Sequence, residues 1–232
     1  MGAHDRGRLC LAAVERAMTG RVTLERPWLT FDLGTRMQVL SWAINRPGFV
    51  KANRILWREV RNADLPQDMD VHGWLGDTLE ARDDSDAVCF LTSRDVGFFT
   101  QASAEVGDAV AHCVATVGLS NAERVGHRVD RSNFDWGTIN IAVALQSGLS
   151  QTGLIEALTI AAQARTAAIL ELGLALPTGI ATGTGTDCIA VAAPQSSADY
   201  AGLHTEIGEA IGRAVYDATL EGGRDWMRDM KG

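Results

Sequence analysis

The order of strand-like and helix-like segments most constrains what this chain can fold into. Segments rich in Val, Ile, Thr and Phe come mainly first, and two long helical segments come late. Few strands alternate with helices, so a regular parallel α/β fold is not expected. We therefore expect an α+β or mixed α/β fold in a single domain, with a mixed or largely antiparallel sheet.

The expected strands share partial alternation of apolar and polar residues. They cover residues 21–24, 28–32, 37–44, 87–92, 97–102, 109–117, 138–144 and 188–193. Residues 50–60 favour a short helix, with Ile55, Leu56 and Val60 as its apolar positions. The polar stretches 61–70 and 121–136 favour loops.

Two long helices are expected to pack on the sheet, Gln151–Leu172 and residues 205–220, which run from Thr205 to Leu220. The first is rich in alanine, which allows close approach to a sheet. The second has apolar residues at every third or fourth position, and Thr205 is a suitable N-cap.

Composition limits the function classes. The chain of 232 residues has 21 Lys and Arg against 29 Asp and Glu, a net charge of −8. No excess basic surface is therefore expected for nucleic acid or an anionic membrane. The four cysteines have no metal-site spacing, and the N-terminal apolar stretch is too short for a secretory signal. We expect a cytoplasmic protein with one domain over 1–232, including an N-terminal extension over 1–20, and homo-oligomers remain open.

A turn rich in glycine and threonine carries the strongest chemical signal. It runs through Thr182, Gly183, Thr184, Gly185, Thr186 and Asp187. Backbone N–H groups and hydroxyls in such a turn can hold an oxyanion, an amide or a phosphate, and a carboxylate beside it can act as base or metal ligand. The segment matches neither GxGxxG nor the P-loop pattern. A plain hairpin turn with a capping aspartate is the alternative.

Other polar residues could complete a site. His204 and Glu206 stand at the start of the last helix, where the dipole favours a neutral imidazole, although surface residues would look the same. His127 lies in the polar loop and could reach a site. The short clusters GLSNA and GTINI add candidates for binding an amide: Ser120, Asn121, Thr138 and Asn140. Turns and strand ends explain these clusters equally well.

Four blocks of the chain resemble one known family in order and content. They are TVGLSNAERVG (116–126), GTINIAVAL (137–145), ATGTGTDCIAVAAP (181–194) and AGLHTEIGEAIGRAVYDA (201–218). The chain resembles the adenosylcobinamide amidohydrolases over residues 36–220. The resemblance implies hydrolysis of the amide between the aminopropanol side chain and the corrin ring, giving adenosylcobyric acid for cobalamin salvage. The corrinoid is then the substrate, and complete corrinoids such as pseudocobalamin are further candidates.

Hydrolysis of an unactivated amide needs a base, an oxyanion contact and a proton for the leaving amine. Our hypothesis makes Asp187 or His204 the base and uses Thr184 and Thr186 as oxyanion contacts.

The remaining candidates complete this hypothesis. Glu206 or Glu209 would orient the base or act as acid, although Glu209 is also suited to pair with Arg213. Asn121 and Asn140 would bind propionamide groups of the corrin.

A divalent metal on Asp187, His204 and Glu206 is an option within this hypothesis, and no other cofactor is expected. Two alternatives stay open: a non-catalytic module that binds or transfers corrinoids, and a hydrolase of another small amide.

Overall fold

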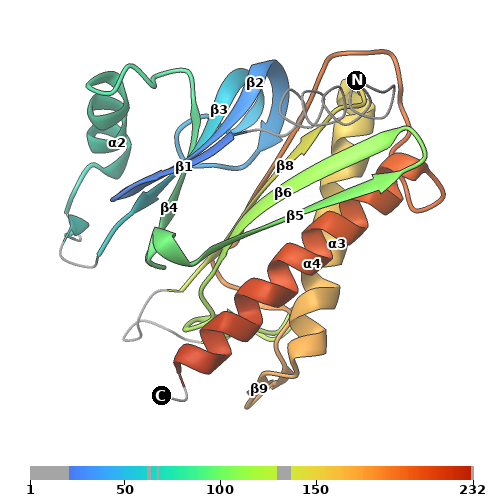
Figure 1. The fold of residues 1–232 in the computed structure, drawn as a ribbon. Helices are drawn as coiled ribbons and strands as arrows, with labels where there is room; N and C mark the ends of the chain where they lie inside the picture. Colours follow the sequence, from blue (N-terminus) through green and yellow to red (C-terminus); the bar gives the residue numbers. More distant parts are fainter. Residues whose placement is uncertain (1–20, 62–63, 67, 130–136, 231–232) are drawn as a thin grey trace, which may run out of the picture.

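The computed structural model describes residues 21–61, 64–66, 68–129 and 137–230 (Figure 1). The expected extension over 1–20 lies outside the described residues. The helices of the described part are α2 (Val71–Glu80), η2 (Val96–Phe98), α3 (Gln151–Leu172) and α4 (Glu206–Asp229). The strands of the main sheet are β1 (Arg21–Glu25), β2 (Trp28–Ser41), β3 (Gly48–Glu59), β4 (Val88–Thr92), β5 (Phe99–Val106), β6 (Ala109–Val117), β8 (Ile139–Leu145) and β12 (Cys188–Ala193). Short strands are β7 (Ala122–Glu123), β9 (Ala175–Leu176), β10 (Gly179–Ile180) and β11 (Gly183–Thr184).

The main sheet is mixed, which confirms the expected fold class. Its order is β4-β3-β2-β12-β8-β6-β5, with β1 paired to β2 beside this path. The pairs β12–β8 and β3–β4 are parallel, and the other pairs are antiparallel. The long helices α3 and α4 lie together against one side of this sheet (Figure 1).

The two faces of the sheet build separate apolar cores. On one face, Ile141, Val143 and Ile189 pack with residues of α3 and α4 such as Ile160 and Ile211. Alanine and glycine are frequent on both helices, so the helices lie close to the strands.

On the other face, the sheet is strongly curved. The strands β1, β3, β4 and the first part of β2 fold over the central strands β6, β8 and β12. Phe31, Trp57 and Phe90 from this part share a core with Val114 and Ala142 from the central strands. Helix α2 covers the outer side of β3 and β4, far from α3 and α4 (Figure 1).

The predicted helix over 50–60 is wrong, because residues 50–59 belong to strand β3. Both faces of β3 are covered, so Ile55, Leu56 and Trp57 are all fully buried and the alternation typical of a half-exposed strand is lost. Helix α2 was not expected, and it begins directly after the predicted loop 61–70 with Asp70 as its N-cap.

Two expected strands, 28–32 and 37–44, are one long strand, β2. The pairing with β3 shifts register between Asp32 and Met37, where Gly34 has a φ of +75°. Turn-like residues in this irregular stretch made one strand look like two.

Both long helices occur where they were expected. Helix α3 begins after Ser150, whose hydroxyl accepts from Gly153 N, and α4 begins after the predicted N-cap Thr205, which accepts from Gly208 N. Helix α4 continues to Asp229, beyond the expected end at Leu220.

Among the described helices, α3 alone has the length and apolar composition to cross a membrane. It packs against α4 and β12. Arg165 near its middle forms an ion pair inside the protein with Asp187, as expected for a core helix.

Candidate active site

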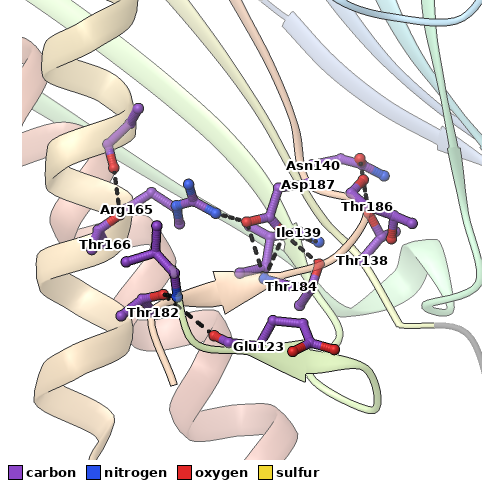
Figure 2. A network of polar contacts seen from close by, with 12 residues as sticks. Glu123, Thr138, Ile139, Asn140, Arg165, Thr166, Thr182, Thr184, Thr186 and Asp187 are labelled. Atoms are coloured by element: carbon purple, nitrogen blue, oxygen red, sulfur yellow. Dashed lines mark hydrogen bonds and ion pairs between the residues drawn. The ribbon is translucent and has the colours of Figure 1, made fainter. Parts of the chain in front are cut away.

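Asp187 is the fixed centre of the glycine- and threonine-rich turn. Its carboxylate accepts from Thr184 N at 3.1 Å, from Ile139 N at 3.3 Å and from the Thr184 hydroxyl. It also pairs with the guanidinium of Arg165, which reaches across from α3 (Figure 2). The side chain of Asp187 is only 7% exposed, so its negative charge is stabilised almost entirely by these groups.

Arg165 is the counterion that the sequence did not reveal. Its side chain is 16% exposed, and burial lowers the pKa of its guanidinium. Arginine remains protonated in proteins, so the pair places two opposite charges in the protein interior. The signal available in the sequence was a lone arginine in the middle of an alanine-rich helix.

Gly183 leaves room for this ion pair. A Cβ on Gly183 would lie 2.6 Å from Asp187 Oδ2 and closer still to the guanidinium of Arg165. Glycine is therefore required here by close approach, and the turn is built around the buried pair.

Thr186 is held from both sides by neighbouring loops. Its hydroxyl accepts from Asn121 Nδ2 at 3.3 Å and donates to Gly137 O at 3.0 Å. The Thr138 hydroxyl donates to the Thr186 carbonyl at 2.9 Å. The clusters that contain Asn121 and Thr138 thus contact the turn through hydrogen bonds within the protein.

Two cavities meet at Thr186, which lines both of them. The larger, about 770 Å³, has a mainly apolar wall that includes Trp42, Val60, Met69, Phe90 and Leu91. Thr138, Asn140, Asp187 and Cys188 also line it.

The smaller cavity has a volume of about 490 Å³ and shares Thr186 with the larger one. It is lined by Gly185 and Thr186 together with polar residues of the loop after β7: Asn121, Glu123, Arg124, His127 and Arg128. Asn121 is only 5% exposed in this wall, and its Oδ1 has no hydrogen-bond partner among the residues that the structure describes. A substrate group with an N–H donor would satisfy that oxygen.

The family of this chain follows from its match to a protein-family model. The model of the family described as adenosylcobinamide amidohydrolase (CbiZ) matches residues 11–231, almost the whole chain. The chain belongs to the adenosylcobinamide amidohydrolase family. The family is one of amide hydrolases, which confirms the predicted enzyme class.

The individual proteins that resemble this chain match it over a short segment or at low sequence identity. An uncharacterized protein of Methanocaldococcus jannaschii is 37% identical over 89 residues, which are 37% of this chain and 35% of that protein. The chain thus matches about a third of the length of that relative. The PH0078 protein of Pyrococcus horikoshii has a TM-score of 0.44 and 10% identity, covering 88% of this chain and 79% of its own. A β-aminopeptidase of Burkholderia sp. has a TM-score of 0.46 and 12% identity, covering 84% and 78%.

In this adenosylcobinamide amidohydrolase family member, Glu206 and its neighbour His204 lie at the wrong end of the sheet to join Asp187. Glu206 accepts from Asp108 N in the β5–β6 hairpin. Asp187 adjoins Cys188, which pairs with Asn140 and through it with Thr116 on β6. Asp108 precedes Thr116 by eight residues, a separation of about 27 Å along an extended strand.

The expected grouping of Asp187, His204 and Glu206 is therefore not formed, and a single metal ion could not contact all three. No cluster of three or more His, Cys, Asp or Glu side chains with metal-site geometry occurs among the described residues. Glu209 pairs with Arg213 on α4, which is the alternative that the sequence had offered for it.

Several expected substrate contacts have structural partners instead. The Thr182 hydroxyl accepts from Val125 N at 2.8 Å and donates to Glu123 O at 3.3 Å. The amide of Asn140 donates to Leu91 O at 3.0 Å and ties β8 to β4, although Asn140 also lines the larger cavity.

Four of the expected contacts line neither cavity: Ser120, Thr182, Gly183 and Thr184. Cys188 lines the larger cavity, but burial raises the pKa of its thiol to about 12. It is therefore an uncharged thiol near neutral pH and a poor nucleophile.

Proposed function

We propose that this protein hydrolyses the amide between the aminopropanol arm and the corrin ring of adenosylcobinamide, giving adenosylcobyric acid. The observation that carries the proposal is that Thr186 lines two cavities with different side chains in their walls. The larger cavity, with many apolar side chains, suits the corrin side of the amide, and the smaller cavity, whose wall includes Asn121, Arg124 and His127, suits the leaving amine. The scissile carbonyl then lies over the Thr186 hydroxyl.

In this proposal Thr186 contacts the oxygen of the scissile carbonyl. If the Thr186 hydroxyl rotates away from Gly137 O, it can donate to the developing oxyanion. Its oxygen can still accept the hydrogen bond from Asn121. Thr186 has no base as a hydrogen-bond partner among the described residues, so it is a poor nucleophile. Water is therefore the attacking group.

Asp187 is a positioning residue in this mechanism. Its lone pairs are occupied by N–H donors, a hydroxyl and Arg165, so it is poorly suited to accept a proton from water. It fixes the turn that presents Thr186. Asp187, one of the two bases that the sequence suggests, is therefore not the base in this mechanism.

His127 is the residue we assign to proton transfer. It lines the smaller cavity together with Thr186, on the side where the amine leaves. Water adds to the carbonyl carbon, the C–N bond breaks, and the imidazole passes the proton from water to the departing amine.

Replacing His127 is expected to lower kcat at least 100-fold, the usual cost of losing a general acid–base group. The matched control is His204→Ala, another exposed histidine, which lies next to Glu206 at the other end of the sheet and is expected to change kcat less than 2-fold. Steady-state rates with adenosylcobinamide measure both variants. A large loss of kcat in His204→Ala, with His127→Ala fully active, would contradict this assignment. It would indicate that the active site lies at the start of α4.

The smaller cavity also favours substrates with a longer, phosphate-bearing arm. Its volume of about 490 Å³ exceeds the need of a neutral aminopropanol group, and Arg124, His127 and Arg128 line it. No carboxylate partner of Arg124 or Arg128 occurs among the described residues. This supports a proposal that complete corrinoids with a nucleotide loop are further substrates.

Arg124→Ala is expected to raise KM about 10-fold for adenosylcobinamide phosphate and less than 3-fold for adenosylcobinamide, because a hydrogen bond to a charged group contributes about 1.5–3 kcal/mol. Arg213→Ala, at an exposed arginine on α4, is the matched control. Equal changes in KM for both substrates would contradict an anion contact at Arg124.

The test of the function itself is incubation with adenosylcobinamide under dim light, followed by mass spectrometry. Formation of adenosylcobyric acid and 1-amino-2-propanol supports the proposal. Binding without product would favour a non-catalytic corrinoid-binding module, and cleavage of a different small amide alone would favour another amidohydrolase.

A further inference from the structure

Trp42 is a large aromatic side chain that the fold leaves open to solvent. It follows the end of β2 and is 47% exposed, whereas Trp28 is 6% exposed and Trp57 is fully buried. It belongs to none of the apolar cores of the described residues. It lines the larger cavity instead, so its exposed surface borders the site.

The indole is also fixed in place. Its Nε1 donates to the carbonyl of Asp187 at 2.8 Å. Asp187 is itself held by Thr184, Ile139 and the ion pair with Arg165. A tryptophan that is held by its polar edge presents its ring surface to a ligand at little further cost in conformational entropy.

The surroundings of Trp42 are suited to a flat, weakly polar ring. The wall of the cavity that Trp42 lines includes Val60, Leu65, Pro66 and Met69 from the segment after β3, with Arg61 as the charged residue of that segment. Apolar walls beside an aromatic face favour a ring that stacks rather than a charged group.

We propose that Trp42 stacks on the adenine of the substrate's adenosyl group and thereby selects adenosylated corrinoids. This inference rests on the proposed function. Adenine is a flat heteroaromatic ring of about the size of an indole. The corrin offers no comparable flat face, because axial ligands and projecting side groups cover both of its sides. Stacking of a base on an aromatic side chain commonly changes affinity by about 10-fold or more.

The test measures binding of two ligands that lack the scissile amide, adenosylcobyric acid and cyanocobyric acid, by equilibrium dialysis in dim light. The full-length protein is expected to bind the adenosyl form at least 10-fold more tightly than the cyano form. Trp42→Ala should lose this preference by weakening adenosyl binding about 10-fold, with cyano binding changed less than 2-fold. Trp42→Phe should keep most of the preference, because it retains an aromatic face and loses only the bond to Asp187.

Phe49→Ala is the matched control, since Phe49 is 41% exposed on the neighbouring strand and does not line the cavity. It should bind both ligands as the original protein does. Three results would overturn the inference: no adenosyl preference in the original protein, equal weakening of both ligands in Trp42→Ala, or equal losses in the Phe and Ala variants.

The same variants separate this inference from the proposed function. If the protein releases no amine from adenosylcobinamide but shows an adenosyl preference that depends on Trp42, hydrolysis is refuted and the stacking stands. If it hydrolyses the amide while Trp42→Ala keeps the full preference, the stacking is refuted and hydrolysis stands.

Discussion

Thr186→Val is expected to lower kcat with adenosylcobinamide about 100-fold or more, with little change in KM. Valine keeps the shape of threonine and removes the hydroxyl that accepts from Asn121 and donates to Gly137. Loss of one oxyanion contact commonly lowers kcat by about 10²–10³-fold. Steady-state kinetics in dim light separates kcat from KM.

The controls distinguish this loss from a general loosening of the turn. Thr186→Ser retains a hydroxyl and should keep kcat within about 10-fold. Thr182→Val removes a hydroxyl from the same segment that bonds to Val125 N and Glu123 O and lines neither cavity. It should destabilise the protein by about 0.5–1.5 kcal/mol, the usual net contribution of a hydrogen bond, because Val125 is exposed and its N–H can bond to water instead, while kcat falls less than 3-fold. Equal kcat losses at both threonines would show that Thr186 acts only through structure.

Arg165→Met is expected to lower the free energy of unfolding by about 3–5 kcal/mol, because Asp187 would be left as a buried charge without its counterion. The turn that presents Thr186 depends on this carboxylate, so we expect kcat/KM to fall at least 100-fold. Denaturant unfolding and steady-state kinetics measure the two effects.

The double variant Arg165→Met/Asp187→Asn separates charge from geometry. It removes both charges and leaves the asparagine oxygen to accept from Thr184 N and Ile139 N, so it should be at least 1 kcal/mol more stable than Arg165→Met. Its kcat should also recover in part, as expected for a positioning residue. Restored stability with no recovery of kcat would instead support Asp187 as the base, and unchanged stability in Arg165→Met would refute the role of the ion pair.

The sequence was informative wherever a local pattern decides the structure. The periodic apolar residues from Ile207 to Ala218 and the cap at Thr205 predicted the start of α4 correctly. The turn before β12 was also identified from its glycines and threonines. Strand β3 was missed because burial on both faces removes the period of two on which strand prediction depends.

Which residues share the site depends on contacts between segments that are far apart in the sequence, and a local sequence pattern does not predict such contacts. Arg165 pairs with Asp187 from a helix that precedes it in the chain, and neither residue has a motif that indicates the other. His204 follows Asp187 by only 17 residues, yet β12 carries the chain to the opposite end of the sheet between them. Asp187 and His204 are close in sequence, which suggested one site. Strand β12 runs between them and places them at opposite ends of the sheet.

A single-turnover reaction in ¹⁸O-labelled water tests the central claim most directly. Excess protein is mixed with adenosylcobinamide in dim light, and both the corrinoid and the intact protein are followed by mass spectrometry. The account predicts adenosylcobyric acid with one ¹⁸O atom in its new carboxylate, unlabelled 1-amino-2-propanol and an unchanged protein mass. Recovery of unchanged substrate from the bound complex, or a corrinoid acyl adduct on Thr186, would contradict it.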